Sequence, residues 1–169
     1  PASAAPILEP LSGARIYLFP ADPHVAELAR FVAGPQSHAG RLLPGNAGEL
    51  SPPQLARFRP GLGATFRWQG QGRDTVYVKI QKGADAAQAV NALQTLRAAA
   101  AGHHFAVPDA TGFDPGINAY AMREVRGEIY RDTLAQAAPA EVAARTRHLL
   151  SALEEFHACG VKPEQRLSS

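Results

Sequence analysis

Three short segments with strand character follow one another closely in the middle of this chain, and they constrain its fold more than any other feature. The segments are residues 55–59, 64–69 and 75–81. Glycine-bearing turns at 60–63 and 70–74 join them, and connections this short make neighbouring strands antiparallel. Phe66 and Trp68 share one face of the second segment, so we expect them in the core rather than stacked on a base. The pattern predicts an antiparallel meander.

The third segment carries the most informative side chain. Val76, Val78 and Ile80 alternate with Tyr77 and Lys79, which is the period of a strand with one buried face. Taken alone, a strand lysine is usually an exposed residue at a sheet edge. The order of the surrounding elements favours a different interpretation, in which the strand holds Lys79 rigidly and its ammonium group binds phosphate.

The segments before the meander predict a less regular start. We expect a short strand at 16–19 and then a helix that Asp22 caps, with Pro23 at its first position. The helical spacing before Gly34 is that of Val25, Leu28, Ala29 and Val32. Glycine and proline recur from 34 to 53, which indicates a loop or linker.

The segments after the meander predict two helices and a second hairpin. Residues 85–101 form an alanine-rich helical pattern, and 103–125 contains a turn at 114–116 followed by a strand from 119. A strong helix is expected from 140 to 158, ending at Gly160. Its expected buried stripe is Val142, Leu149, Leu150, Leu153 and Phe156. We therefore predict an α+β fold with about five antiparallel strands and a helix crossing the sheet.

Composition excludes several classes of partner. The chain has a formal net charge of +2 with basic and acidic residues interspersed, so we expect no nucleic-acid partner. No apolar run is long enough to span a bilayer and the start lacks a signal-peptide pattern, which predicts a cytoplasmic protein without a membrane partner. Cys159 is the single cysteine, and we expect a buried or incidental thiol. Capping and turn formation account for Asp109, Asp114 and Asp132, and no metal site is expected among them.

A series of motifs extends over residues 55–160. They are Arg59-Pro60-Gly61, Val76-Tyr77-Val78-Lys79, Val107-Pro108, Ala121-Met122-Arg123-Glu124-Val125-Arg126-Gly127, and Leu149 to His157. In this order the motifs resemble those of the aminoglycoside phosphotransferase family. The resemblance implies a protein-kinase-like fold and transfer of the γ-phosphate of ATP to a hydroxyl group of a small molecule.

The resemblance assigns roles to residues of the small lobe. Lys79 is similar to the strand lysine that binds the α- and β-phosphates, normally steadied by a glutamate on the next helix. That helix has no glutamate here, and Gln88 lies nearest its expected place. The role could pass to Asp85, to a residue outside this sequence or to the nucleotide itself, or the protein could be catalytically degenerate. Gly61 and Gly63 could approach phosphate or serve only a tight hairpin turn. Tyr77 could line the nucleotide pocket or close it.

The resemblance also places the hinge between two lobes. Met122 would stand behind the adenine ring, and main-chain groups of Glu124 and Arg126 would pair with the adenine edge. His157 is expected to pack or cap at a helix end rather than to act in catalysis. Residues 1–53 would be an N-terminal extension, 54–126 the nucleotide-binding small lobe, and 127–169 the hinge and first helical part of the large lobe.

The catalytic loop and the magnesium-binding aspartate of such enzymes have no counterpart in this sequence. We expect a fragment of a longer protein that binds ATP, with Mg²⁺ ligands and the catalytic base elsewhere. The acceptor and the oligomeric state stay open. One alternative is a catalytically inactive kinase-like regulatory or interaction module, and a more distant one is an unrelated α+β binding domain.

Overall fold

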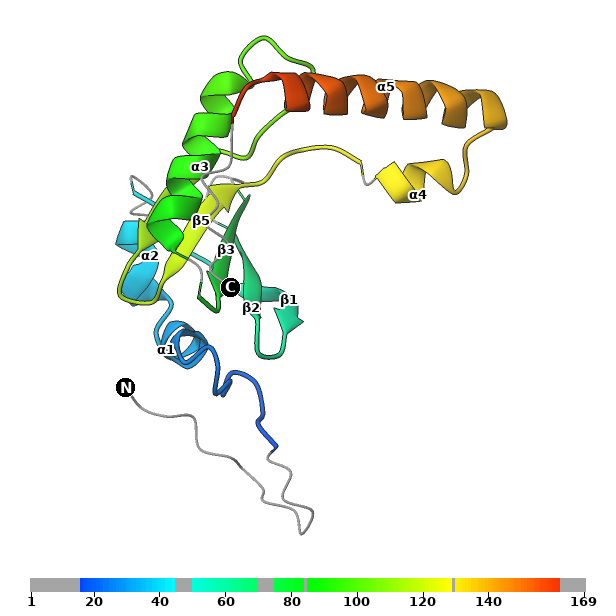
Figure 1. Cartoon of the computed structure of the whole chain (residues 1–169). Helices are drawn as coiled ribbons and strands as arrows, with labels where there is room; N and C mark the ends of the chain where they lie inside the picture. Colours follow the sequence, from blue (N-terminus) through cyan, green and yellow to red (C-terminus); the bar gives the residue numbers. More distant parts are fainter. Residues whose placement is uncertain (1–15, 45–49, 70–74, 84, 129, 162–169) are drawn as a thin grey trace. The chain divides into compact units, whose positions relative to one another are not determined.

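A computed structural model describes residues 16–44, 50–69, 75–83, 85–128 and 130–161 (Figure 1). The chain forms two compact units. The sheet unit comprises Pro1–Asn91 with Ala110–Glu124, and the helical unit comprises Ala92–Asp109 with Val125–Ser169. Each unit is described by itself below. In the described part of the chain, no helix combines the length and apolar character needed to cross a membrane.

Five antiparallel strands form the sheet, which confirms the α+β class and the expected meander and second hairpin (Figure 1). The strands are β1 (Gln54–Arg59), β2 (Gly63–Gln69), β3 (Thr75–Gln81), β4 (Ala110–Asp114) and β5 (Ala119–Arg123). Their spatial order is β1-β2-β3-β5-β4, so the strand that carries Lys79 lies in the middle.

The two faces of the sheet carry different kinds of side chain. On one, the core face, apolar side chains of β2, β3 and β5 pack with α1 and α2 into a single buried cluster. The strand residues of that cluster are Ala64, Phe66, Trp68, Val76, Val78, Ile80, Ala119 and Ala121. Phe66 and Trp68 are buried as expected, and Phe31 of α1 meets both rings, at centroid distances of 4.8 and 5.8 Å. Burying one such ring contributes on the order of 2–3 kcal/mol. The opposite face, the open face, carries Tyr77 and Lys79.

The N-terminal segment differs from its prediction. Residues 17–20 are not a strand, since only Ile16 makes an isolated bridge. The first helix, α1 (Glu27–Ala33), begins later than expected because the Asp22 carboxylate accepts hydrogen bonds from the N–H groups of His24 and Gly61 instead of capping it. Val32 is exposed and Phe31 is buried in its place.

The predicted loop at 34–53 contains a second helix, α2 (Gln36–Leu42), which is a correction. Pro35 precedes its first turn, a position that suits a helix start as well as a loop. The helix lies against β4 and β5, and Leu42 is fully buried in the core. Burial of Leu42 and the packing of α2 on the sheet override the local glycine and proline signals.

Asp114, at the end of β4, anchors α2 to the sheet. Its side chain is fully buried and its oxygens lie 2.7 Å from His38 Nδ1, 3.2 Å from Arg41 Nη1 and 2.8 Å from the donating N–H of Gly116. Burial raises the pKa of the Asp114 carboxyl, but the His38 bond, the Gly116 amide and the positive charge of Arg41 more than offset burial. The net pKa lies below its ordinary value, so the carboxylate is ionised in the folded protein.

The main chains of α2 and β4 also approach each other closely at this contact. Gly112 of β4 faces the carbonyl groups of Arg41 and Leu42, and a Cβ atom there would overlap the Arg41 oxygen. Thr111 Oγ1 donates a hydrogen bond to the Leu42 carbonyl at 2.8 Å. Only glycine fits at position 112 unless α2 moves away from the sheet.

The third helix, α3 (Ala86–Ala99), begins where expected. Its residues up to Asn91 belong to the sheet unit, and those from Ala92 belong to the helical unit. Asp85 Oδ1 accepts from the N–H groups of Ala87 and Gln88 at 2.9 and 3.1 Å, and Asn118 Oδ1 accepts from Ala86 N–H at 3.0 Å. The amides of the first turn are therefore satisfied within the protein.

The helical unit contains a short helix that the sequence did not predict, α4 (Tyr130–Leu134), and the expected long one, α5 (Pro139–Ala158). The predicted buried stripe on α5 is wrong, because none of its residues is buried. Leu149, Leu150, Leu153 and Phe156 are between 38% and 53% exposed, and Val142 is partly buried. Among the described residues of this unit, short segments contact α5, for example through the Tyr130–Thr146 hydrogen bond and the Phe105–Phe156 ring contact.

Glu155 joins the segment after α3 to α5. Its oxygens accept from the His104 N–H and lie within hydrogen-bonding distance of His104 Nδ1, both at 2.7 Å, while His103 Nδ1 lies 3.4 Å away. The hydrogen bond between the His104 ring and the Glu155 carboxylate raises the pKa of His104. The hydrogen bond from the backbone N–H of His104 lowers the pKa of Glu155. His104 is exposed and Glu155 is partly exposed, so this contact positions the segment and adds little stability. Cys159 is partly buried and its thiol donates to the Phe156 carbonyl.

We predict that Asp114→Asn lowers the free energy of unfolding by about 2–3 kcal/mol at pH 7, since it replaces a buried charged acceptor of three contacts with a neutral amide. Because the folded pKa is the lower one, the stabilisation is present above about pH 4 and is lost as pH falls through the folded value. Urea denaturation of wild type and variant from pH 7 to pH 3 measures both effects. Asp132→Asn, at an exposed carboxylate, is the control; equal loss in both variants would contradict the prediction.

Candidate functional site

The open face of the sheet is the candidate site, and strand register arranges its side chains in two rows. The first row, from β1 to β4, is Arg57, Thr65, Lys79, Tyr120 and Phe113. The second row is Gln54, Arg67, Tyr77, Met122 and Ala110. Directly opposite residues have Cβ atoms about 5 Å apart. Neither row contains an acidic residue, and together they carry three cationic side chains, Arg57, Arg67 and Lys79. One carboxylate, that of Glu124, reaches the second row at Tyr77, so the face is positive in balance.

Lys79 occupies the middle of the first row. Thr65 and Tyr120 are its cross-strand neighbours, and Tyr120 is only 8% exposed. The Lys79 side chain is half-buried and makes no hydrogen bond or ion pair with any residue in the described ranges. A partly desolvated ammonium group without a carboxylate partner is a ready ligand for an anion.

Tyr77 lies beside Lys79 in the second row, and its hydroxyl donates to Glu124 Oε1 at 3.0 Å. Burial is the main cause that raises the pKa of the Tyr77 phenol, and the neighbouring Glu124 carboxylate raises it further against an opposing effect of Arg67. The phenol is therefore a neutral donor that holds the Glu124 side chain at the end of β5. Met122, opposite Tyr77, is buried.

One of the main-chain groups predicted to pair with adenine already takes part in the sheet. The N–H of Glu124 donates to the Thr75 carbonyl at 2.9 Å and so extends the pairing of β3 and β5. The Glu124 and Arg126 side chains are exposed. Pairing of the Glu124 and Arg126 main chain with adenine stays a prediction, and for Glu124 the sheet leaves the carbonyl rather than the N–H for that purpose.

Gly61 and Gly63 have structural explanations in the turn between β1 and β2. The N–H of Gly61 donates to the buried Asp22 carboxylate at 2.7 Å, and that of Leu62 donates to the Arg59 carbonyl. Gly63 has φ 138°, and a Cβ atom there would overlap the Ile80 carbonyl oxygen. The hairpin role accounts for both glycines, and a phosphate role stays a prediction.

Gln88 does not contact Lys79. Its side chain is exposed on the first turn of α3, and its N–H donates to Asp85. Neither Gln88 nor Asp85 forms a hydrogen bond or ion pair with Lys79 in the part of the chain that the structure describes. The lysine is thus left without the acidic neighbour that the resemblance would supply.

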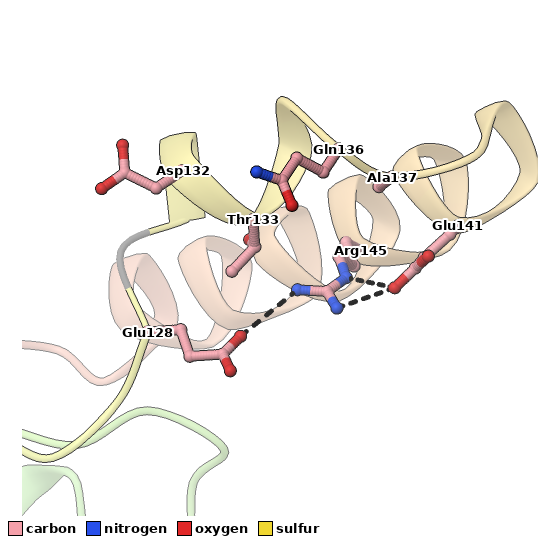
Figure 2. A pocket seen from close by; sticks show the side chains of 7 residues that line it. All are labelled: Glu128, Asp132, Thr133, Gln136, Ala137, Glu141 and Arg145. Atoms are coloured by element: carbon pink, nitrogen blue, oxygen red, sulfur yellow. Dashed lines mark hydrogen bonds and ion pairs between the residues drawn. The ribbon is translucent and has the colours of Figure 1, made fainter.

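The helical unit has a cavity of about 550 Å³ between the segment around α4 and α5 (Figure 2). Arg145 reaches into it and is bound to Glu141 Oε1 at 2.7 Å and, more weakly, to Glu128 at 3.9 Å. Asp132 adds a third carboxylate to the lining. Three carboxylates against one guanidinium make this lining negative, so it would repel a polyphosphate. The open face suits a phosphate better.

Comparison with models of known protein families and with curated protein sequences finds no match. Among the residues that the structure describes, no three histidine, cysteine or acidic side chains come together in a group that could hold a metal ion. The case for a function therefore depends on the geometry of the open face.

Sequence analysis missed several residues of this face. Thr65 and Arg67 could have been found by extending to β2 the alternation that places Lys79 opposite the core. Tyr120 follows from the same rule on β5. Arg57 could not, because its face depends on an irregularity in β1 that no sequence signal marks.

We predict that Glu124→Gln lowers the pKa of Tyr77 toward its ordinary value, because the variant removes the negatively charged Glu124 carboxylate that lies beside the phenol oxygen. Carbon-13 NMR titration of labelled tyrosine, with the Tyr77→Phe spectrum for assignment, measures the midpoint. Glu154→Gln, on the exposed surface of α5, should leave it unchanged. An unaltered Tyr77 midpoint in Glu124→Gln would rule out the hydrogen bond.

Proposed function

We propose that this chain carries the ATP-binding small lobe of a small-molecule phosphotransferase similar to the aminoglycoside phosphotransferases. The observation that carries the proposal is the position of Lys79 on the central strand. Its side chain is half-buried and pairs with no described residue, and the two rows of its face lack acidic residues. The sheet order and the mixed α+β class are compatible with a kinase-like small lobe.

The electrostatics of the face support a phosphate ligand. A triphosphate brings several negative charges and many acceptor oxygens, and an ammonium group without a competing carboxylate can donate to them at no cost in broken ion pairs. A lysine on a central strand is also held more rigidly than one on a loop, which lowers the entropy lost on binding.

The second row of side chains would bind the adenine base of the nucleotide. Tyr77 offers a partly exposed aromatic ring, and buried Met122 lies beside it on β5. A purine packed there would have its phosphates directed toward Lys79, two residues along the same strand. Base and phosphate subsites would thus lie on adjacent rows of one sheet face.

Phosphoryl transfer also needs a base and magnesium ligands, which the resemblance places outside this sequence. The described residues hold no group suited to a metal ion, so no magnesium site is derived for this chain. What these residues would do is bind and orient the nucleotide and offset part of its charge.

One observation favours a second candidate, a catalytically inactive kinase-like module. The residues of α3 include no carboxylate, and Gln88 forms no hydrogen bond with Lys79. In active members of the family that the motifs resemble, a glutamate on this helix steadies the lysine. A module that binds nucleotide without transferring phosphate would tolerate its loss.

We predict that the 169-residue chain binds ATP and that Lys79→Ala weakens binding about 10- to 100-fold, the value of one or two charge-assisted hydrogen bonds. Isothermal titration calorimetry measures the dissociation constants. Lys82→Ala is the matched control, since Lys82 is an exposed lysine just after β3 and should leave affinity within about twofold.

Absence of ATP binding by the wild-type chain would end the proposal. In the intact protein, transfer of phosphate from ATP to a hydroxyl acceptor, lost in Lys79→Ala, supports the phosphotransferase. Binding without transfer to any of a panel of amino sugars, sugars and amino alcohols supports the inactive module instead.

A further inference from the structure

A β-bulge in β1 decides which side chain joins the row of Lys79. Leu55 pairs with Phe66 of the core face, and the register then shifts so that Arg57, not Ala56, lies opposite Thr65. In a regular ladder Ala56 would occupy that place and Arg57 would point to the core side. The bulge therefore turns an arginine onto the open face.

The next residues of β1 support this orientation. Phe58 pairs with Ala64, packs against the core, and meets the ring of Phe19 at a centroid distance of 5.0 Å. Because neighbours alternate along a strand, Arg57 must lie on the other side, with Thr65 and Lys79. Bulges that redirect a side chain are frequent next to functional sites.

The resulting strip across three strands has the chemistry of a phosphate site. Arg57 is exposed, Lys79 is half-buried, and neither forms an ion pair or hydrogen bond with any described residue. Between them Thr65 offers a hydroxyl group. Like charges gathered on one sheet face repel each other, and an anion with at least two charges would relieve that repulsion.

We infer that Arg57 and Thr65 extend the phosphate site from Lys79 and bind the terminal phosphate groups of the nucleotide. The inference rests on the function proposed above. Tyr77 and Met122 place the base on β3 and β5, Lys79 on β3 meets the first phosphates, and the chain of phosphates then continues over Thr65 toward Arg57 on β1. The guanidinium group suits this position because its planar fork can donate two hydrogen bonds to one phosphate.

The test compares ligands that differ only in phosphate number. Dissociation constants of the full 169-residue chain are measured for ATP, AMP and inorganic tripolyphosphate. Arg57→Ala is expected to weaken ATP and tripolyphosphate about tenfold and to leave AMP within about twofold, with Arg57→Lys between the two. Arg147→Ala, which removes an exposed charge that pairs with no described residue, controls for net charge, and thermal unfolding midpoints control for folding.

Two outcomes overturn the inference: ATP affinity unchanged in Arg57→Ala, or ATP and AMP weakened equally. If the wild-type chain binds tripolyphosphate but not ATP, and Arg57→Ala and Lys79→Ala both weaken it, the phosphate strip stands and the proposed nucleotide function fails. If the wild-type chain binds neither ligand, both fail.

Discussion

Burial of one face of a five-stranded sheet under two short helices is the interaction on which the sheet unit depends. Phe31 contacts the rings of both Phe66 and Trp68, and Leu42 of α2 belongs to the same cluster. Helices of seven residues have no stability of their own, so α1 and α2 exist because the sheet gives them an apolar surface to cover. The buried Asp114 carboxylate adds direction to that packing, since its bonds to His38 and Arg41 fix α2 in one position on β4.

The other face carries polar side chains on β2 and β3, while Tyr120 and Met122 of β5 are buried on it. Alternation along β2 and β3 sends Thr65, Arg67, Tyr77 and Lys79 away from the core. The core face supplies rigidity, and the open face presents cations that no carboxylate in its two rows neutralises. A nucleotide site is our proposal for that face, and the Arg57 strip extends it. The lack of a glutamate on α3 is the observation that weighs most against catalysis.

The sequence predicted the parts of the fold that local patterning controls. The bounds of β3 follow from period-two alternation and the start of α3 from its alanine-rich helical pattern, and both predictions agree with the structure to within one residue. The N-terminal segment was predicted poorly because Asp22 bonds to Gly61, far away in sequence, and because α2 forms on an apolar surface that the sequence does not reveal. The α5 stripe shows the reverse error: its apolar spacing is helical, but spacing alone does not say whether anything covers it.

The sequence by itself determined the meander, the side of β3 that Lys79 occupies and the absence of a carboxylate from the helix that follows, because alternation and composition are local properties. Tertiary structure alone decided that Tyr77 holds Glu124, that Asp22 takes the Gly61 amide, and that a bulge turns Arg57 toward Lys79. Each of these depends on which strands become neighbours and in which register. Register is set by how the whole apolar face is buried, and no short stretch of sequence contains that information.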